Sequence, residues 1–142
     1  MSRPQPEDIQ RVGILGTGVI GGGWALHFLR LGLEVVAYDP GAEAQKRFAR
    51  MVEATWPTME KLGLRDGASP ENLSFVSDME EMTERAEVVQ ESTPESLESK
   101  QELLGKLDSL ARPETVILSS TSGLAMTDMQ KGCAHPERTV IG

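Results

Sequence analysis

A glycine-rich segment near the start of the chain constrains the fold more than any other feature of the sequence. Gly16, Gly18 and Gly21 fit the pattern G-x-G-x-x-G. A short apolar run at 12–15 precedes them, and apolar residues at helical spacing follow them. This context predicts a strand, a tight turn and a helix that hold a pyrophosphate, because the glycines let the backbone approach the anion and the first N–H groups of the helix point at it. The residues expected to bind the dinucleotide here are Gly16, Thr17, Gly18, Val19, Ile20 and Gly21.

A carboxylate follows at the position where such a unit binds ribose. Asp39 lies 18 residues after Gly21, directly after a second apolar run at 33–38. At the end of a second strand, this group would accept hydrogen bonds from the ribose hydroxyls and repel a 2′-phosphate. Pro40 and Gly41 follow it instead of an arginine, so the sequence favours NAD over NADP. The alternative is a glycine-rich turn with Asp39 as an ordinary loop acid.

Short apolar runs alternate with amphipathic segments along the rest of the chain. We expect strands at 12–15, 33–38, 73–76, 88–90, 115–118 and 139–141, and helices at 20–31, 42–62, 79–86, 97–110 and 124–131. Pro57 should bend or interrupt the second helix, because proline has no backbone N–H to donate. Strands that alternate with helices predict a doubly wound, mostly parallel α/β sheet of the Rossmann type. We place this single domain at 11–142, after a polar tail at 1–10.

The composition supports one globular domain and excludes several classes of partner. Of the 142 residues 39% are hydrophobic, and 14 basic and 22 acidic residues give a formal charge of −8. That charge argues against nucleic acid and anionic membranes as partners, because both attract basic surfaces. No apolar stretch approaches the roughly 18 residues of a spanning helix, and residues 1–10 lack the apolar core of a signal peptide. We therefore expect a cytoplasmic protein.

The cysteine content and the placement of the acids add two further expectations. Cys133 is the single cysteine, so no intramolecular disulfide forms, and with only two histidines we expect no Cys/His zinc site and no other metal. Between Asp78 and Glu102 the chain has nine acids and two bases, a charge of −7. We interpret most of these acids as solvated faces of helices.

Four stretches resemble one known family. They are VGILGTGVIGGGWA, RAEVVQESTPESLESK, VILSSTSGL and HPERTVIG. Together they make the chain from Arg11 to Gly142 similar to the NAD-binding domain of the 3-hydroxyacyl-CoA dehydrogenases. The resemblance implies that Glu95 and Lys100 contact the cofactor and that Ser122, as the catalytic residue within this chain, bonds the substrate oxygen near the nicotinamide. Taken singly, Glu95 could be an acid at a helix start and Lys100 a solvated partner of a neighbouring acid.

The same resemblance bears on the substrate. The stretches EATWPTMEKLGL and SSTSGL are most similar to the members of this family that oxidise L-carnitine. The members that act on acyl-CoA place a serine and a lysine on the second helix, and Thr55 and Lys61 or Leu62 match those places poorly. The resemblance thus implies a small-molecule substrate, either L-carnitine or a 3-hydroxyacyl-CoA, whose 3-hydroxy group becomes a 3-oxo group by hydride transfer to NAD.

The catalytic base of this family lies outside these residues. In the family a histidine, oriented by a glutamate, follows V-I-G directly, and here the sequence ends at Val140-Ile141-Gly142. We therefore expect a fragment of a longer enzyme, truncated before a helical C-terminal domain, inactive alone and homodimeric through that domain when complete. The alternative from another class is a stand-alone nucleotide-sensing module, which a natural stop codon after Gly142 would favour.

Overall fold

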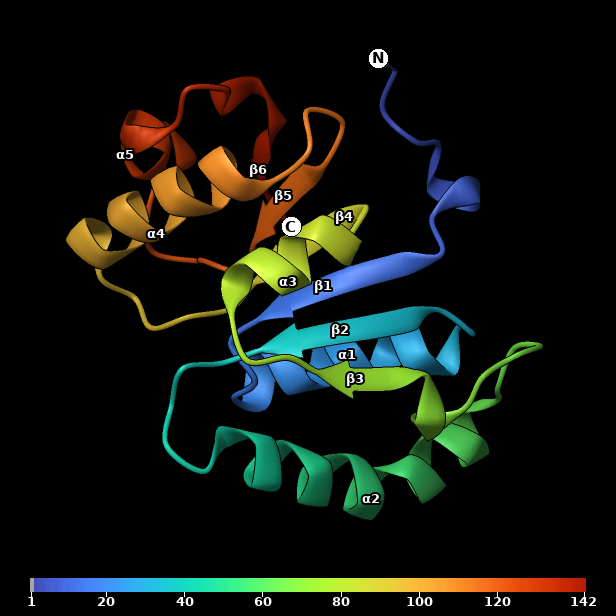
Figure 1. Cartoon of the computed structure of the whole chain (residues 1–142). Helices are drawn as coiled ribbons and strands as arrows, with labels where there is room; N and C mark the ends of the chain where they lie inside the picture. The colour runs from blue at the N-terminus through green and yellow to red at the C-terminus, as the bar shows by residue number, and fades with distance from the viewer. Residues whose placement is uncertain (1) are drawn as a thin grey trace.

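Six parallel strands form the centre of the molecule, and helices lie on both faces of the sheet (Figure 1). The computed structural model describes residues 2–142. The strands are β1 (Arg11–Leu15), β2 (Glu34–Tyr38), β3 (Leu73–Phe75), β4 (Val88–Glu91), β5 (Val116–Ser119) and β6 (Thr139–Ile141). The helices are α1 (Val19–Arg30), α2 (Ala44–Leu62), α3 (Met79–Arg85), α4 (Leu97–Leu110) and α5 (Met126–Met129). The predicted doubly wound α/β fold is confirmed.

The strand order determines where a ligand can bind. Across the sheet the order is β3-β2-β1-β4-β5-β6. The chain first moves outward from β1 to β3, then crosses back to β4 on the other side of β1. This reversal leaves a crevice at the carboxyl ends of β1 and β4, where open α/β sheets bind their ligands. In register, Leu15 lies between Tyr38 and Glu91, so the segments that follow these three strands emerge side by side.

Two apolar cores hold the helices against the sheet. Val35 and Ala37 belong to one core and Val36 to the other, as the two-residue period of a strand requires. Under α1 and α2 the buried core residues are Val12, Ile14, Ala25, Leu26, Leu29, Val35, Ala37, Phe48 and Val52. Under α3, α4 and α5 they are Leu15, Val36, Val76, Met79, Met82, Ala86, Val89, Leu104, Leu107, Ile117 and Met129. The sheet is therefore buried on both faces, and this fixes the carboxyl edge as a rigid platform.

Two local predictions are not fully met. Pro57 does not interrupt α2, which continues through it, and Phe48 and Val52 before it and Met59 after it all pack on the core. This packing offsets the missing backbone hydrogen bond, and a bend at Pro57 stays a prediction. The helix predicted at 124–131 is shorter and continues as a 3-10 turn (Gln130–Gly132), in which Gly132 lies against Gly105 of α4.

The first ten residues contain one short turn, a 3-10 helix at Pro6–Asp8, and otherwise no helix or strand among those described. Two further 3-10 turns, Pro70–Asn72 and Pro136–Arg138, lead into β3 and β6. Every helix in the described part of the chain is too short or too polar to cross a membrane.

Candidate functional site

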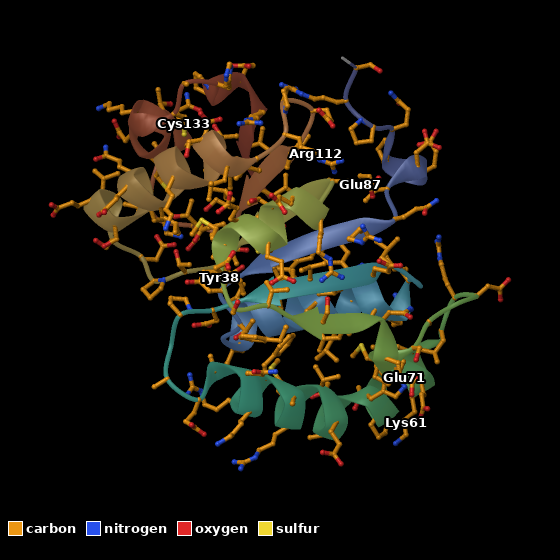
Figure 2. All side chains as sticks on the ribbon, in the orientation of Figure 1. Tyr38, Lys61, Glu71, Glu87, Arg112 and Cys133 are labelled. Carbon is orange, nitrogen blue, oxygen red and sulfur yellow. The ribbon has the colours of Figure 1, made fainter. Side chains whose placement is uncertain are left out.

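A cavity of about 670 Å³ lies at the carboxyl edge of the sheet, at the crevice between β1 and β4. Figure 2 labels Tyr38, the last residue of β2, at this edge, with Glu87 and Arg112 toward the opposite edge. Three segments line the cavity, one after each of the adjacent strands β1, β2 and β4. The segment after β4 continues into α4. The lining residues are Gly16, Gly18, Val19, Ile20, Asp39, Pro40, Gly41, Ser92, Thr93, Pro94, Ser96, Ser99 and Leu103.

A side chain is excluded at Gly16 and Gly21 for a different reason than at Gly18. Gly16 has φ +90°, and a Cβ there would lie 2.8 Å from the carbonyl oxygen of Ser92. A Cβ on Gly21 would overlap the carbonyl oxygen of Gly16. A Cβ on Gly18, in contrast, would have no heavy atom within 4 Å. The fold therefore requires Gly16 and Gly21, whereas Gly18 keeps open a space at the start of α1.

The open space beside Gly18 fits the pyrophosphate of a dinucleotide. Gly18 is the N-cap residue of α1, and no side chain caps its first N–H groups. Those groups and the positive end of the 12-residue helix therefore face the cavity and can bind an anion. The donor set and the space agree with the prediction made from the glycine pattern.

Asp39 lies at the rim of the cavity and is already bonded to the glycine segment. Its Oδ2 accepts hydrogen bonds from the backbone N–H of Thr17 at 2.8 Å and from the Thr17 hydroxyl at 3.0 Å, and its Oδ1 accepts one from the N–H of Gly41 at 2.8 Å. A carboxylate can accept about four hydrogen bonds. One acceptor site on Oδ1 is thus left for a ligand hydroxyl.

The charge state of Asp39 follows from these contacts. Burial alone would raise its pKa, but the hydrogen bonds from Thr17 and Gly41, together with the nearby Arg47 guanidinium, lower the pKa below its usual value of 3.8. The group is therefore an anion at neutral pH, a state that accepts ribose hydroxyls and repels a phosphate.

Lys100 lies beneath the cavity wall and does not line the cavity. Its side chain is 1% exposed, and its Nζ lies 2.9 Å from Oε1 and 3.1 Å from Oε2 of Glu91, which is fully buried. The interpretation of Lys100 as a solvated side chain is therefore wrong. Sequence reasoning missed Glu91, although one signal was present, because an acid that ends a buried strand needs a partner.

Glu95 and the loop that carries Ser122 lie beside each other next to the cavity. Glu95 is half exposed, with Oε1 3.8 Å from Nζ of Lys100 and Oε2 accepting a 2.8 Å hydrogen bond from the Thr121 hydroxyl. Ser122 follows directly and is exposed. A Cβ on Gly123 would lie 3.6 Å from Oε2 of Glu95. The structure thus brings the three residues that the resemblance singled out into one cluster, at the edge of the cavity.

The comparison with protein families decides the identity of this domain. The family described as the NAD-binding domain of 3-hydroxyacyl-CoA dehydrogenase matches residues 11–142, nearly the whole chain. The chain belongs to this family. NAD is the cofactor of these domains, as the glycine segment and Asp39 predicted. The resemblance found in the sequence is confirmed.

Curated relatives of this NAD-binding domain are L-carnitine dehydrogenases. The chain is 51% identical to that of Streptomyces coelicolor over 96% of its own length and 43% of the relative. It is 52% identical to that of Streptomyces griseus over 96% of its own length and 41% of the relative. The chain therefore spans less than half the length of these relatives.

Solved structures show the same domain within longer chains. A diketoreductase superposes with a TM-score of 0.84 at 28% identity, covering 94% of this chain and 49% of the other. The 3-hydroxybutyryl-CoA dehydrogenase of Escherichia coli K12 superposes with a TM-score of 0.81 at 28% identity, covering 92% of this chain and 28% of the other.

A second buried ion pair in this NAD-binding domain was not predicted. Arg138 is 2% exposed, and its Nε donates to Oδ1 of Asp108 at 2.7 Å. Oδ2 of Asp108 accepts the N–H groups of Ala134 and His135 at 2.7 and 3.1 Å. Burial alone would raise the pKa of Asp108, but these hydrogen bonds and the arginine charge lower it. The pair anchors the segment before β6 to α4, away from the cavity.

Proposed function

We propose that this domain binds NAD in the cavity at the carboxyl edge and serves an oxidoreductase that converts the 3-hydroxy group of L-carnitine to a 3-oxo group. The single observation that carries the binding site is the open space at Gly18, which lies between uncapped N–H groups of α1 and the anionic Asp39. When bound, NAD supplies the acceptor for the hydride.

Each group of residues has its own part in this proposal. The N–H groups of the segment from Gly16 to Gly21 bind the pyrophosphate, and the free acceptor site of Asp39 binds an adenosine ribose hydroxyl. Glu95 and Ser122 lie together at the β4 and β5 side of the crevice, so we assign them to the nicotinamide end, with Ser122 donating a hydrogen bond to the substrate oxygen. Lys100 belongs to the same end.

Two observations support L-carnitine over a 3-hydroxyacyl-CoA. The first is the sequence identity of 51% and 52% to two L-carnitine dehydrogenases. The second is the sequence of α2, where the family members that act on acyl-CoA place a serine and a lysine for the CoA moiety. Thr55 and Lys61 or Leu62 match those places poorly, so the CoA contacts of those members lack clear counterparts in this chain.

The substrate assignment is tested with the longest gene product that contains these residues. NADH formation from L-carnitine and from 3-hydroxybutyryl-CoA is compared at equal NAD. We expect the larger specificity constant with L-carnitine. A larger constant with the acyl-CoA would overturn the substrate and leave the 3-hydroxy oxidation intact. A reading frame that stops at Gly142, with no turnover of either compound, would favour a nucleotide-sensing module. The cytoplasmic location and the homodimer remain predictions.

A further inference from the structure

The buried pair of Glu91 and Lys100 is not explained by stability alone. Both side chains are at most 1% exposed, yet burying two charges costs about as much as their attraction returns, and apolar residues of similar volume often serve as well. The carboxylate of Glu91 also accepts hydrogen bonds from Thr93 and Ser119. Burial alone would raise the pKa of Glu91, but these donors lower it below 4.5. The pair is therefore a fixed ionic centre with contacts to several segments.

One set of contacts leads from Glu91 to the cavity wall. Oε1 of Glu91 accepts both the backbone N–H of Thr93 at 2.6 Å and the Thr93 hydroxyl at 2.5 Å, which fixes the backbone and the side chain of Thr93 at once. Thr93 lines the cavity. Its Cγ2 would lie 3.3 Å from a Cβ on Gly16, so Thr93 backs the first glycine of the segment. Glu91 thereby sets the position of the wall that faces the glycine turn.

A second set of contacts leads from the pair to the loop after β5. Oε2 of Glu91 accepts the Ser119 hydroxyl at 2.5 Å, at the end of β5. Nζ of Lys100 lies 3.8 Å from Oε1 of Glu95, whose Oε2 accepts the Thr121 hydroxyl at 2.8 Å. The Thr121 oxygen in turn accepts the N–H of Leu124 at 3.3 Å. The exposed Ser122 is therefore held between residues connected to the pair.

We propose that Glu91 and Lys100 act as one positioning unit, which holds the Thr93 wall and the Ser122 loop at the spacing that the bound dinucleotide requires. Lys100 then contributes through Glu91 and Glu95 and not by direct contact with NAD. This inference rests on the proposed binding of NAD in the cavity. It assigns a role to Glu91 and changes the role of Lys100 from ligand to support.

A double-mutant cycle separates a positioning unit from a direct ligand. The variants are Glu91→Leu, Lys100→Met and the double variant, with Lys106→Met on the exposed side of α4 as the matched control. NADH affinity is measured by fluorescence titration and the unfolding temperature by differential scanning. We expect each single variant to lose about tenfold in affinity and the double variant to lose no more than a single one, because residues that act as a unit are not additive. We expect the control to bind like the wild type.

The unfolding temperature distinguishes positioning from a merely structural role. Each single variant leaves one buried charge unpaired and should melt at a lower temperature, whereas the double variant should recover because no unpaired charge remains. Weak NADH binding by a double variant that melts like the wild type supports the proposal. Wild-type affinity in the double variant overturns it. The proposal is also overturned if the losses in NADH affinity of the two single variants multiply in the double variant. It is likewise overturned if Glu91→Leu binds NADH normally while Lys100→Met does not. Both results would favour direct contact between Lys100 and NAD.

A measurement without NADH distinguishes failure of the positioning role from failure of the proposed function. Hydrogen exchange at the Thr93 amide should become faster in Glu91→Leu and in the double variant, while exchange at the Val35 amide in β2 stays unchanged. If the wild-type chain does not bind NADH, the proposed function fails, and the inference fails with it. If the wild type binds NADH and exchange at Thr93 does not change, only the positioning role fails.

Discussion

Asp39 and Thr17 are joined by two hydrogen bonds to the same carboxylate oxygen, one from the Thr17 backbone N–H at 2.8 Å and one from its hydroxyl at 3.0 Å. These bonds connect the end of β2 to the glycine segment before any ligand arrives. Because Gly41 occupies only one site on the other oxygen, the carboxylate keeps an acceptor directed to a ligand. The proposed ribose site is thus already formed in the folded structure without a ligand.

Removing this carboxylate should weaken NAD binding. We expect Asp39→Ala to cost about 1–3 kcal/mol in NADH affinity through lost hydrogen bonds to ribose. NADPH affinity should not fall in parallel, because the repulsion of its 2′-phosphate is removed. Both affinities are measured by titration, with Glu60→Ala on the exposed face of α2 as the control. An unchanged NADH affinity would show that Asp39 does not bind the ribose.

Arg47 should become a phosphate ligand once Asp39 is gone. Its guanidinium lies close enough to Asp39 to lower the pKa of that carboxyl, and its Nη2 would lie 3.5 Å from a Cβ on Gly41. We expect Asp39→Ser to gain NADPH affinity because an arginine near the ribose accommodates a 2′-phosphate. Adding Arg47→Ala should abolish that gain. An equal gain with and without Arg47 would exclude the arginine as the phosphate partner.

Alanine at Gly18 should affect NADH binding, whereas alanine at Gly21 should affect the stability of the fold. Gly18→Ala places a methyl group in open space, so we expect the fold to persist while NADH binding is lost, because the methyl group occupies the place of the pyrophosphate. Gly21→Ala should destabilise the fold, because its Cβ would overlap the backbone of Gly16. Thermal unfolding and NADH titration of both variants check this. If Gly18→Ala binds NADH normally, the cavity beside it is not the pyrophosphate site.

The stability of the domain should fall in acid. The folded-state pKa values of Asp39, Glu91 and Asp108 are all lowered from 3.8, 4.5 and 3.8. A lowered pKa in the folded state contributes stability that is present above the unfolded value and is lost as the pH falls through the folded value. We therefore expect the unfolding temperature to drop as the pH falls below about 4.5. Asp108→Asn should reduce the slope, and an equal slope in this variant would contradict the role of Asp108.

The sequence predicted the fold well because the decisive signals are local. The glycine pattern, the acid after the second apolar run and the alternation of strands and helices each depend on residues close in sequence. The position of Asp39 beside the glycine segment follows from two adjacent parallel strands, Leu15 opposite Tyr38, and needed no side-chain detail.

The buried ion pairs could not be read from the sequence in the same way. Arg138 and Asp108 are 30 residues apart, and no periodicity indicates which acid an arginine meets after folding. The resemblance implied a cofactor contact for Lys100, but no local pattern indicated that its Nζ would lie 2.9 Å from the buried Glu91. Pro57 disrupts an isolated helix, yet the packing of its neighbours overrides that local preference. Tertiary contacts decide all three cases.

Titration of the 142-residue chain with NADH, followed by fluorescence or calorimetry, tests the central claim most directly. Gly18→Ala serves as the folded, non-binding control, and its unfolding temperature is measured in parallel. We predict saturable binding of one NADH per chain by the wild type and no saturation by the variant. A wild-type chain that is folded but does not saturate at about 1 mM NADH, which corresponds to a binding free energy weaker than roughly −4 kcal/mol, would contradict it.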